Sequence, residues 1–97
     1  DVDIPVAVDT IYPVRAVYPD SLRRAGVEGH ALVEFVVDSA GRPEVETFAA
    51  VLSTHTLFTE AIRRALDDAR FSPARRGGDP VRQRVQLPFT FSIPKPK

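Results

Sequence analysis

The sequence lacks cysteine, methionine and tryptophan, and it contains two histidines in 97 residues. The absence of cysteine excludes disulfides and thiolate metal sites. The formal net charge is zero, so the chain as a whole lacks the basic excess typical of nucleic-acid-binding proteins. It has no apolar run near the ~20 residues that a membrane span requires, and no recognisable signal peptide. Because it begins with Asp, we expect a segment of a longer protein whose anchor or address lies elsewhere.

Hydrophobic residues make up 43% of the chain, which predicts one folded domain with a single core. Pro5 and Pro13 favour extended geometry in the residues before them, and Ile4 to Val8 is consistent with a short strand. We expect three segments: an extended lead-in over residues 1–17, a domain over residues 18–93 and a flexible tail over residues 94–97.

Residues Val81 to Ser92 alternate between apolar and polar side chains with a period close to two. This pattern predicts a long strand with one buried and one exposed face. Pro88 lies inside it, and proline cannot donate to a ladder, so the strand belongs at a sheet edge or carries a bulge. A long edge strand offers unpaired backbone groups to another chain. The sequence therefore predicts a protein that binds a peptide or another protein.

Backbone groups of successive residues in a strand point to opposite sides. If Pro88 faces the free edge, Gln86 and Thr90 face it too. The residues between them would bond to the neighbouring strand: Val85, Leu87 and Phe89. An added peptide would then hydrogen-bond at Arg84, Gln86 and Thr90.

A β-hairpin is predicted earlier in the chain, with strands over Gly29 to Asp38 and Val45 to Leu52. The turn between them, Asp38 to Arg42, combines an Asp that can bond its own backbone with a Gly that tolerates positive φ. One face of the first strand carries four apolar side chains: Ala31, Val33, Phe35 and Val37. This face is the expected core side.

Two helices are also predicted. The first covers Asp20 to Ala25, with Pro19 at its first position and Gly26 just past its end. The second begins after Thr56 as N-cap and is stopped by Pro73. Its apolar stripe has helical spacing: Phe58, Ala61, Ile62, Ala65, Leu66 and Ala69.

The resulting fold class is α+β, a three-stranded antiparallel sheet with two helices packed on one face. The final strand can pair only with an edge of the hairpin. Antiparallel pairing with the strand over Gly29 to Asp38 is the favoured arrangement, because it leaves the sheet uniformly antiparallel. Parallel pairing with the strand over Val45 to Leu52 remains the alternative.

Several short motifs occur in a characteristic order. They are Tyr18-Pro19, Leu22 to Gly29, Ala31 to Asp38 with the Ala40-Gly41-Arg42 turn, Phe58 to Leu66, Arg70 to Arg75, Gly78, Pro80-Val81 and Val85 to Phe91. Over Tyr18 to Phe91, this series resembles the C-terminal domain of TonB-type energy transducers. The resemblance supports the same fold class.

The resemblance implies a periplasmic domain of a protein anchored in the bacterial inner membrane. Such a domain grips the TonB box, a short extended segment of an outer-membrane transporter, by strand addition to its last strand. An ExbB–ExbD-like proton-channel complex, reached through an N-terminal anchor outside this chain, would supply the energy. The candidate protein-binding residues are Arg15, Tyr18, Pro19, Arg82, Arg84, Val85, Gln86, Leu87, Pro88 and Thr90.

The sequence departs from the family pattern at three places. Family members carry Gln-Pro just ahead of the Tyr-Pro motif, where this chain has Arg15 and Ala16. A second Tyr-Pro pair, Tyr12-Pro13, lies in the lead-in and is a further candidate for the same role. An aromatic residue of the family is replaced by Ala69.

Other functions find less support. His30 and His55 lack carboxylates at ligand spacing, so no metal or cofactor is expected, and an exposed or capping role suits both. No nucleophile, base and oxyanion donor converge, so no enzyme is expected. The alternatives left open are a sensing or scaffolding partner, a ferredoxin-like nucleic-acid-binding module and a homodimer through the edge strand. Four arginines form one basic concentration, which suits either an acidic partner or simple solvation: Arg75, Arg76, Arg82 and Arg84.

Overall fold

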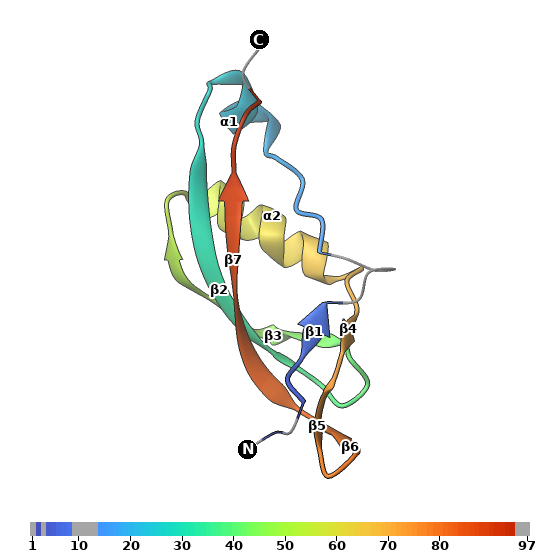
Figure 1. The fold of residues 1–97 in the computed structure, drawn as a ribbon. Helices are drawn as coiled ribbons and strands as arrows, with labels where there is room; N and C mark the ends of the chain where they lie inside the picture. The colour runs from blue at the N-terminus through green and yellow to red at the C-terminus, as the bar shows by residue number, and fades with distance from the viewer. Residues whose placement is uncertain (1, 3, 9–13, 95–97) are drawn as a thin grey trace.

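The computed structural model describes residues 2, 4–8 and 14–94. Tyr12-Pro13 and most of the predicted tail lie outside these residues. In chain order the elements are β1 (Ala7–Val8), α1 (Asp20–Arg24), β2 (Gly29–Val37), β3 (Pro43–Ser53), α2 (Thr56–Leu66), β4 (Phe71–Ser72), β5 (Ala74–Arg76), β6 (Asp79–Val81) and β7 (Gln83–Phe91) (Figure 1).

The central sheet has three strands in the order β3-β2-β7, and both pairings are antiparallel. The long C-terminal strand therefore pairs with the first strand of the hairpin, as favoured from the sequence. Its register with β2 runs from Gly29–Phe91 to Val37–Gln83 without a shift. The prediction of an α+β fold with two helices and a three-stranded antiparallel sheet is confirmed.

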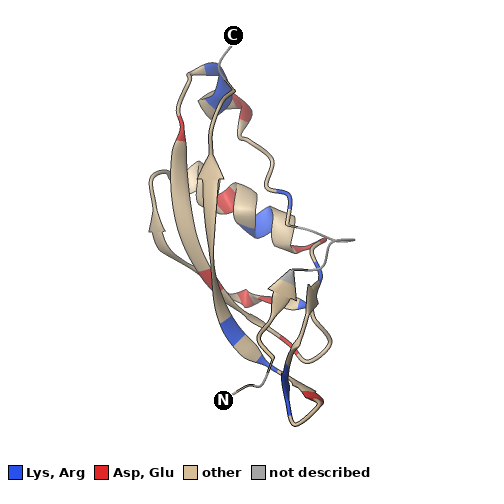
Figure 2. Ribbon diagram, viewed as in Figure 1, with Lys and Arg blue, Asp and Glu red and all other residues tan. Residues whose placement is uncertain are grey.

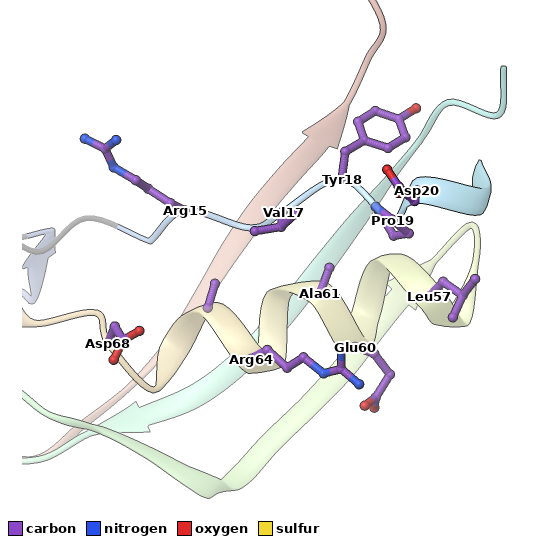
Figure 3. A pocket seen from close by; sticks show the side chains of 11 residues that line it. Arg15, Val17, Tyr18, Pro19, Asp20, Leu57, Glu60, Ala61, Arg64 and Asp68 are labelled. Atoms are coloured by element: carbon purple, nitrogen blue, oxygen red, sulfur yellow. The ribbon is translucent and has the colours of Figure 1, made fainter. Parts of the chain in front are cut away.

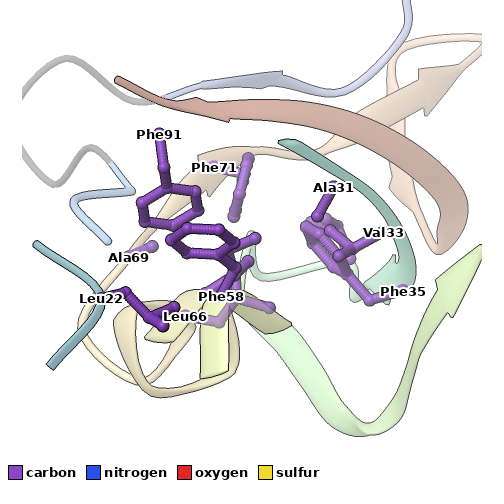
Figure 4. Close-up of a cluster of buried hydrophobic side chains, with 11 residues drawn as sticks. Leu22, Ala31, Val33, Phe35, Phe58, Leu66, Ala69, Phe71 and Phe91 are labelled. Carbon is purple, nitrogen blue, oxygen red and sulfur yellow. The ribbon is translucent and has the colours of Figure 1, made fainter. Parts of the chain in front are cut away.

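The core lies between this sheet and the helices (Figure 4). The predicted face of β2 is buried along its length, with Val33, Phe35 and Val37 fully inaccessible. From α2, the side chains of Phe58, Ile62 and Leu66 fill the space above it, and Leu22 of α1 joins the same cluster. Phe58 stacks on Phe91 of β7 with ring centroids 4.3 Å apart. The end of β7 is thus fastened to α2 by aromatic packing.

The turn between β2 and β3 forms as its sequence predicts. The Asp38 carboxylate accepts hydrogen bonds from the backbone N–H groups of Ala40 and Arg42, each at 2.9 Å. Gly41 has φ +85°, and a Cβ there would lie 2.0 Å from the carbonyl oxygen of Phe71. Since only glycine allows this approach, Phe71 N–H can donate to the Gly41 carbonyl at 2.9 Å. The turn therefore anchors β4 beside the sheet.

The helix boundaries differ from the predicted ones by short steps. His55, and not Thr56, is the N-cap of α2, because its Nδ1 accepts the Leu57 N–H at 3.0 Å. Pro19 is the N-cap of α1 and not its first helical residue. α2 ends at Leu66, well before Pro73. The sequence analysis missed the short strands that follow, β4 and the β5–β6 hairpin.

Part of the lead-in joins the fold through these short strands. β1 pairs antiparallel with β4, and Ile4 forms an isolated bridge with Arg75 of β5. The two Ile4–Arg75 backbone hydrogen bonds measure 3.3 and 2.8 Å. The short strand expected between Ile4 and Val8 is therefore present as Ala7–Val8. Figure 1 shows it next to the end of the molecule that carries the β5–β6 hairpin.

Candidate functional site

β7 is one edge of the central sheet and β3 is the other. Among the described residues, β7 has a strand partner on one side only, β2. The contacts of β2 with β3 fix the direction of the β2 backbone groups. They therefore also determine which backbone groups of β7 are left free by β2.

The even-numbered residues of β2 direct their backbone toward β3. His30 N–H donates to Thr54 Oγ1 at 3.0 Å, and the His30 carbonyl accepts Thr54 N–H at 3.0 Å. Near the other end, Val36 N–H donates to Oγ1 of Thr47 in β3 at 2.8 Å. The unbroken register with β7 keeps β2 regular between these points. The odd-numbered residues of β2 must therefore face β7.

The odd-numbered residues of β7 lie opposite the odd-numbered residues of β2, as in the Val33–Leu87 and Phe35–Val85 pairs. These are the pairs that exchange ladder hydrogen bonds. Pro88 lies opposite Leu32, whose backbone faces β3, so the proline nitrogen points to the free edge. This is the orientation predicted for Pro88, and the edge position accommodates it without a bulge. The same alternation directs the N–H and C=O groups outward at three further residues: Arg84, Gln86 and Thr90.

The outward-facing residues also place their side chains on the exposed face of the sheet. Arg84 Nη1 lies 3.3 Å from Glu34 Oε2, and Gln86 Nε2 donates to Glu34 Oε1 at 3.2 Å. More than half of the Arg84 side chain is exposed, at 58%. Exposed contacts of this kind contribute little stability. They hold the two side chains on the exposed face of the sheet, against Glu34 of β2.

Arg82 lies apart from this edge. Its guanidinium makes two hydrogen bonds of 2.7 Å with the carboxylate of Glu44 in β3. The hydrogen bond from Arg82 lowers the pKa of Glu44, and burial opposes this only in part. The Arg82 side chain is thus directed toward β3, away from the free side of β7. In Figure 2, blue Lys and Arg segments and red Asp and Glu segments both occur at the end of the molecule that carries the β5–β6 hairpin.

Tyr18 lies at the C-terminal end of β7. Its ring contacts Phe91 and Phe58 edge-on, with centroids 5.5 and 5.7 Å apart, and its hydroxyl donates to the Val27 carbonyl. Removal from water raises the pKa of the Tyr18 phenol, and the Glu28 carboxylate raises it further. Tyr18 therefore ties the lead-in to the end of the candidate edge.

Arg15 and Pro19 line a separate groove of about 670 Å³ between the lead-in and α2 (Figure 3). Its walls are mostly apolar, with Val17 77% and Leu57 40% exposed. The structure thus divides the predicted binding residues into the β7 edge, the groove beside α2 and the separate Arg82. Tyr18 lines the groove and also touches β7.

The exposed face of β2 and β7 does not suit base stacking. Phe35 and Phe91 are buried, at 0% and 5% exposure, and Phe89 packs against the core. The even-numbered positions of both strands carry no Phe or Tyr. A nucleic-acid-binding module of the ferredoxin-like type stacks bases on aromatics of this face. The geometry therefore disfavours that alternative.

No group of three or more His, Asp or Glu side chains in the described part of the chain is arranged to hold a metal ion. None of the helices in residues 2, 4–8 and 14–94 is long and apolar enough to cross a membrane. His55 is accounted for by its capping bond.

Comparison with known proteins gives the same assignment as the motifs. The sequence model of the family described as Gram-negative bacterial TonB protein C-terminal matches residues 14–93. The chain belongs to this TonB C-terminal family. The predicted resemblance is therefore confirmed, and the family is one of energy transducers that function in transport.

Relatives of known identity support this placement. The TonB-family chain is 29% identical over 92 residues to Protein TonB of Vibrio cholerae serotype O1, covering 95% of this chain and 36% of the relative. The chain thus spans about a third of the length of that curated relative. The solution NMR structure of the Pseudomonas aeruginosa TonB CTD superposes with a TM-score of 0.76 at 28% identity, covering 98% of this chain and 93% of that one.

Two features of the TonB-family edge were not found from the sequence. Glu34 fixes both Arg84 and Gln86, and its position opposite Gln86 follows only from the strand register. Pro5 and Val6 lie beside β7, where they line a hollow with Val85 and Leu87. Only the weak strand signal at Ile4 to Val8 hinted that this part of the lead-in is ordered.

Proposed function

We propose that this domain is the periplasmic protein-binding module of a TonB-like energy transducer, and that it grips the TonB box of outer-membrane transporters by β-strand addition to β7. The observation that carries the proposal is the direction of the β7 backbone. Arg84, Gln86 and Thr90 turn their N–H and C=O groups away from β2, as argued from the β2–β3 contacts and the β2–β7 register.

Strand addition fits the physical character of this edge. A peptide lying alongside β7 would receive donors and acceptors from three residues and an acceptor from Pro88, in a regular array. Backbone hydrogen bonds then supply affinity, and side-chain contacts on the two faces supply specificity. Pro88 lacks a donor, which discourages continuous edge-to-edge pairing between copies of this chain while leaving room for a short partner strand.

The whole protein, in this proposal, is anchored in the bacterial inner membrane and coupled to an ExbB–ExbD-like proton-channel complex through a segment outside this chain. The domain transmits force by binding and performs no chemistry of its own. Support comes from the family match over residues 14–93 and from the similarity to Protein TonB of Vibrio cholerae.

The proposal is tested by NMR titration of the isotope-labelled domain with TonB-box peptides from transporters of the same organism. We expect shifts concentrated at Arg84, Gln86 and Thr90, with Tyr18 following because it packs on Phe91. The sample must first be shown to be monomeric, since a second copy on the same edge would hide the site. The absence of shifts at millimolar peptide in such a sample would refute strand addition to β7.

A further inference from the structure

A hollow of about 280 Å³ lies between β7 and the lead-in. β7 lines it with consecutive residues from Gln83 to Leu87, and the opposite wall consists of Pro5, Val6 and Phe71. Residues of β2 are not part of the lining. The hollow is therefore continuous with the edge whose outward-facing backbone carries the proposed function.

The lead-in wall of this hollow is held in place by the protein itself. Val6 N–H donates to Gln83 Oε1 at 3.2 Å, which links the lead-in directly to the first residue of β7. On its other side, the lead-in is fixed by the pairing of β1 with β4 and by the bridge between Ile4 and Arg75. The wall thus exists before any partner binds, so a partner would not have to order it.

The lining is apolar where a side chain of an added strand would enter. Neighbouring strands lie about 4.8 Å apart, so a peptide bonded to Gln86 must lie against this hollow. Side chains of paired residues point to the same face of the sheet. Residues of the peptide opposite Val85 and Leu87 would therefore project to the helix side, where Val6 and Phe71 are the next apolar groups.

We infer that the lead-in completes the strand-docking site, and that the hollow formed by Pro5, Val6, Phe71, Val85 and Leu87 binds one apolar side chain of the strand that adds to β7. This inference rests on the proposed function and names the chemistry of its partner. The partner is an extended segment with an apolar residue on the helix side. The residues before and after this apolar residue in the partner segment face Arg84 and Gln86 on the exposed side of the sheet, and they are polar.

The experiment uses the full 97-residue chain and, as probe, a synthetic TonB-box peptide with a series of variants in which each apolar residue is replaced in turn by Ser. Val6→Asp places a charge in the hollow. Val51→Asp is the matched control, because Val51 is 48% exposed on β3, at the opposite edge. Unchanged amide shifts of α2 in each variant establish that the fold is intact.

We expect Val6→Asp to weaken peptide binding about tenfold, because the apolar side chain of the peptide is no longer buried in the hollow. Val51→Asp should change the affinity less than about twofold. One Ser replacement in the peptide should weaken binding to the wild-type chain about tenfold and have little effect on V6D. Intermolecular NOEs between the Val6 methyl groups and that peptide residue provide a second measurement that does not depend on a variant.

Several results would overturn the inference. Shifts at Arg84, Gln86 and Thr90 with equal affinity for the wild-type chain and V6D, and without NOEs to Val6, would refute the role of the hollow and leave strand addition standing. Concentration-dependent shifts around Val6 without peptide would assign the hollow to a second copy of the chain. The absence of any peptide shift in the wild-type chain would refute the proposed function and this inference together.

Discussion

The two edges of the central sheet are built differently. Along β3, the register with β2 shifts between Leu32 and Val33 and again between Glu34 and Val36. Along β7, the register with β2 has no shift over the length of the strand. Bulges twist a strand and break the regular array of groups that another strand needs. The β3 edge is therefore protected against pairing with another strand, and the β7 edge is kept regular.

Side-chain hydroxyls repair the irregular edge from within. At both ends of the β2–β3 pairing, a threonine replaces a ladder acceptor: Thr54 receives the His30 N–H and Thr47 receives the Val36 N–H. The N–H groups that β2 directs toward β3 at His30 and Val36 are therefore satisfied, while β3 itself remains a poor template for pairing with another strand. β7 needs no such repair, because its odd-numbered residues meet β2 with their own backbone.

Proline should destabilise the fold far more at an odd-numbered residue of β7 than at an even-numbered one. Leu87→Pro removes an N–H that bonds to β2 and part of a half-buried apolar side chain, and should lower the free energy of unfolding by about 3 kcal/mol. Gln86→Pro removes an N–H that faces the free edge, as Pro88 already does, and should lower it by about 1 kcal/mol or less. Urea unfolding of both variants measures the difference. Equal losses would contradict the assigned backbone directions.

The second prediction breaks the repair on β3. Thr47→Val removes the hydroxyl that accepts the Val36 N–H. Val36 is only 6% exposed, so water cannot easily replace that acceptor. A buried N–H without a partner should cost about 1–3 kcal/mol of unfolding free energy. Thr90→Val on the exposed face of β7 is the matched control and should change stability by about 0.5 kcal/mol or less. If both variants unfold at the same urea concentration, Thr47 does not serve as a ladder acceptor.

A third prediction concerns partner binding at the regular edge. Gln86→Pro should weaken a TonB-box peptide about three- to tenfold, because one backbone hydrogen bond to the added strand is lost. Ala50→Pro in the irregular strand β3 serves as the control for a proline at the other edge. Isothermal titration calorimetry gives both dissociation constants. A larger loss for Ala50→Pro, in a folded sample, would place the partner on the wrong edge for our proposal.

The smallest effect is the pH dependence of the Arg82–Glu44 pair. Since the hydrogen bond from Arg82 lowers the pKa of Glu44 in the folded state, the pair stabilises the fold above the ordinary Glu value of 4.5. That stability is lost as the pH falls through the lowered pKa. Glu44→Gln should therefore show a weaker dependence of the unfolding midpoint on pH in this acidic range. Parallel curves for the two proteins would show that the pair contributes no measurable stability.

Patterns of period two and 3.6 were sufficient to predict much of this fold. The alternation from Val81 to Ser92 predicted the edge strand, and Pro88 predicted how its backbone is directed. The strand register could not be predicted, because it depends on packing between distant residues, and with it the contacts of Glu34 remained hidden. The capping of α2 was misassigned by one residue since His55 and Thr56 can both accept a backbone N–H.

The short elements after α2 show a different limit of sequence patterns. β4, β5 and β6 have two or three residues each, too few for a period to be recognised. Pro73 and Pro80 within this stretch argue against strands on local grounds. β4 pairs with β1 of the lead-in and is bonded to the Gly41 turn, whereas β5 and β6 pair with each other. The sequence therefore did not predict that the lead-in and Phe71 come together to form the wall of the hollow beside β7.

The alternation of β7 has a consequence for how this strand can change over evolution. Odd-numbered residues give both side chain and backbone to the fold, whereas even-numbered residues give both to the outside, apart from the exposed contacts of Arg84 and Gln86 with Glu34. One strand thus carries two interleaved sets of positions under separate selection. Even-numbered residues can therefore be substituted as the partner changes, without any change to the packing of the core.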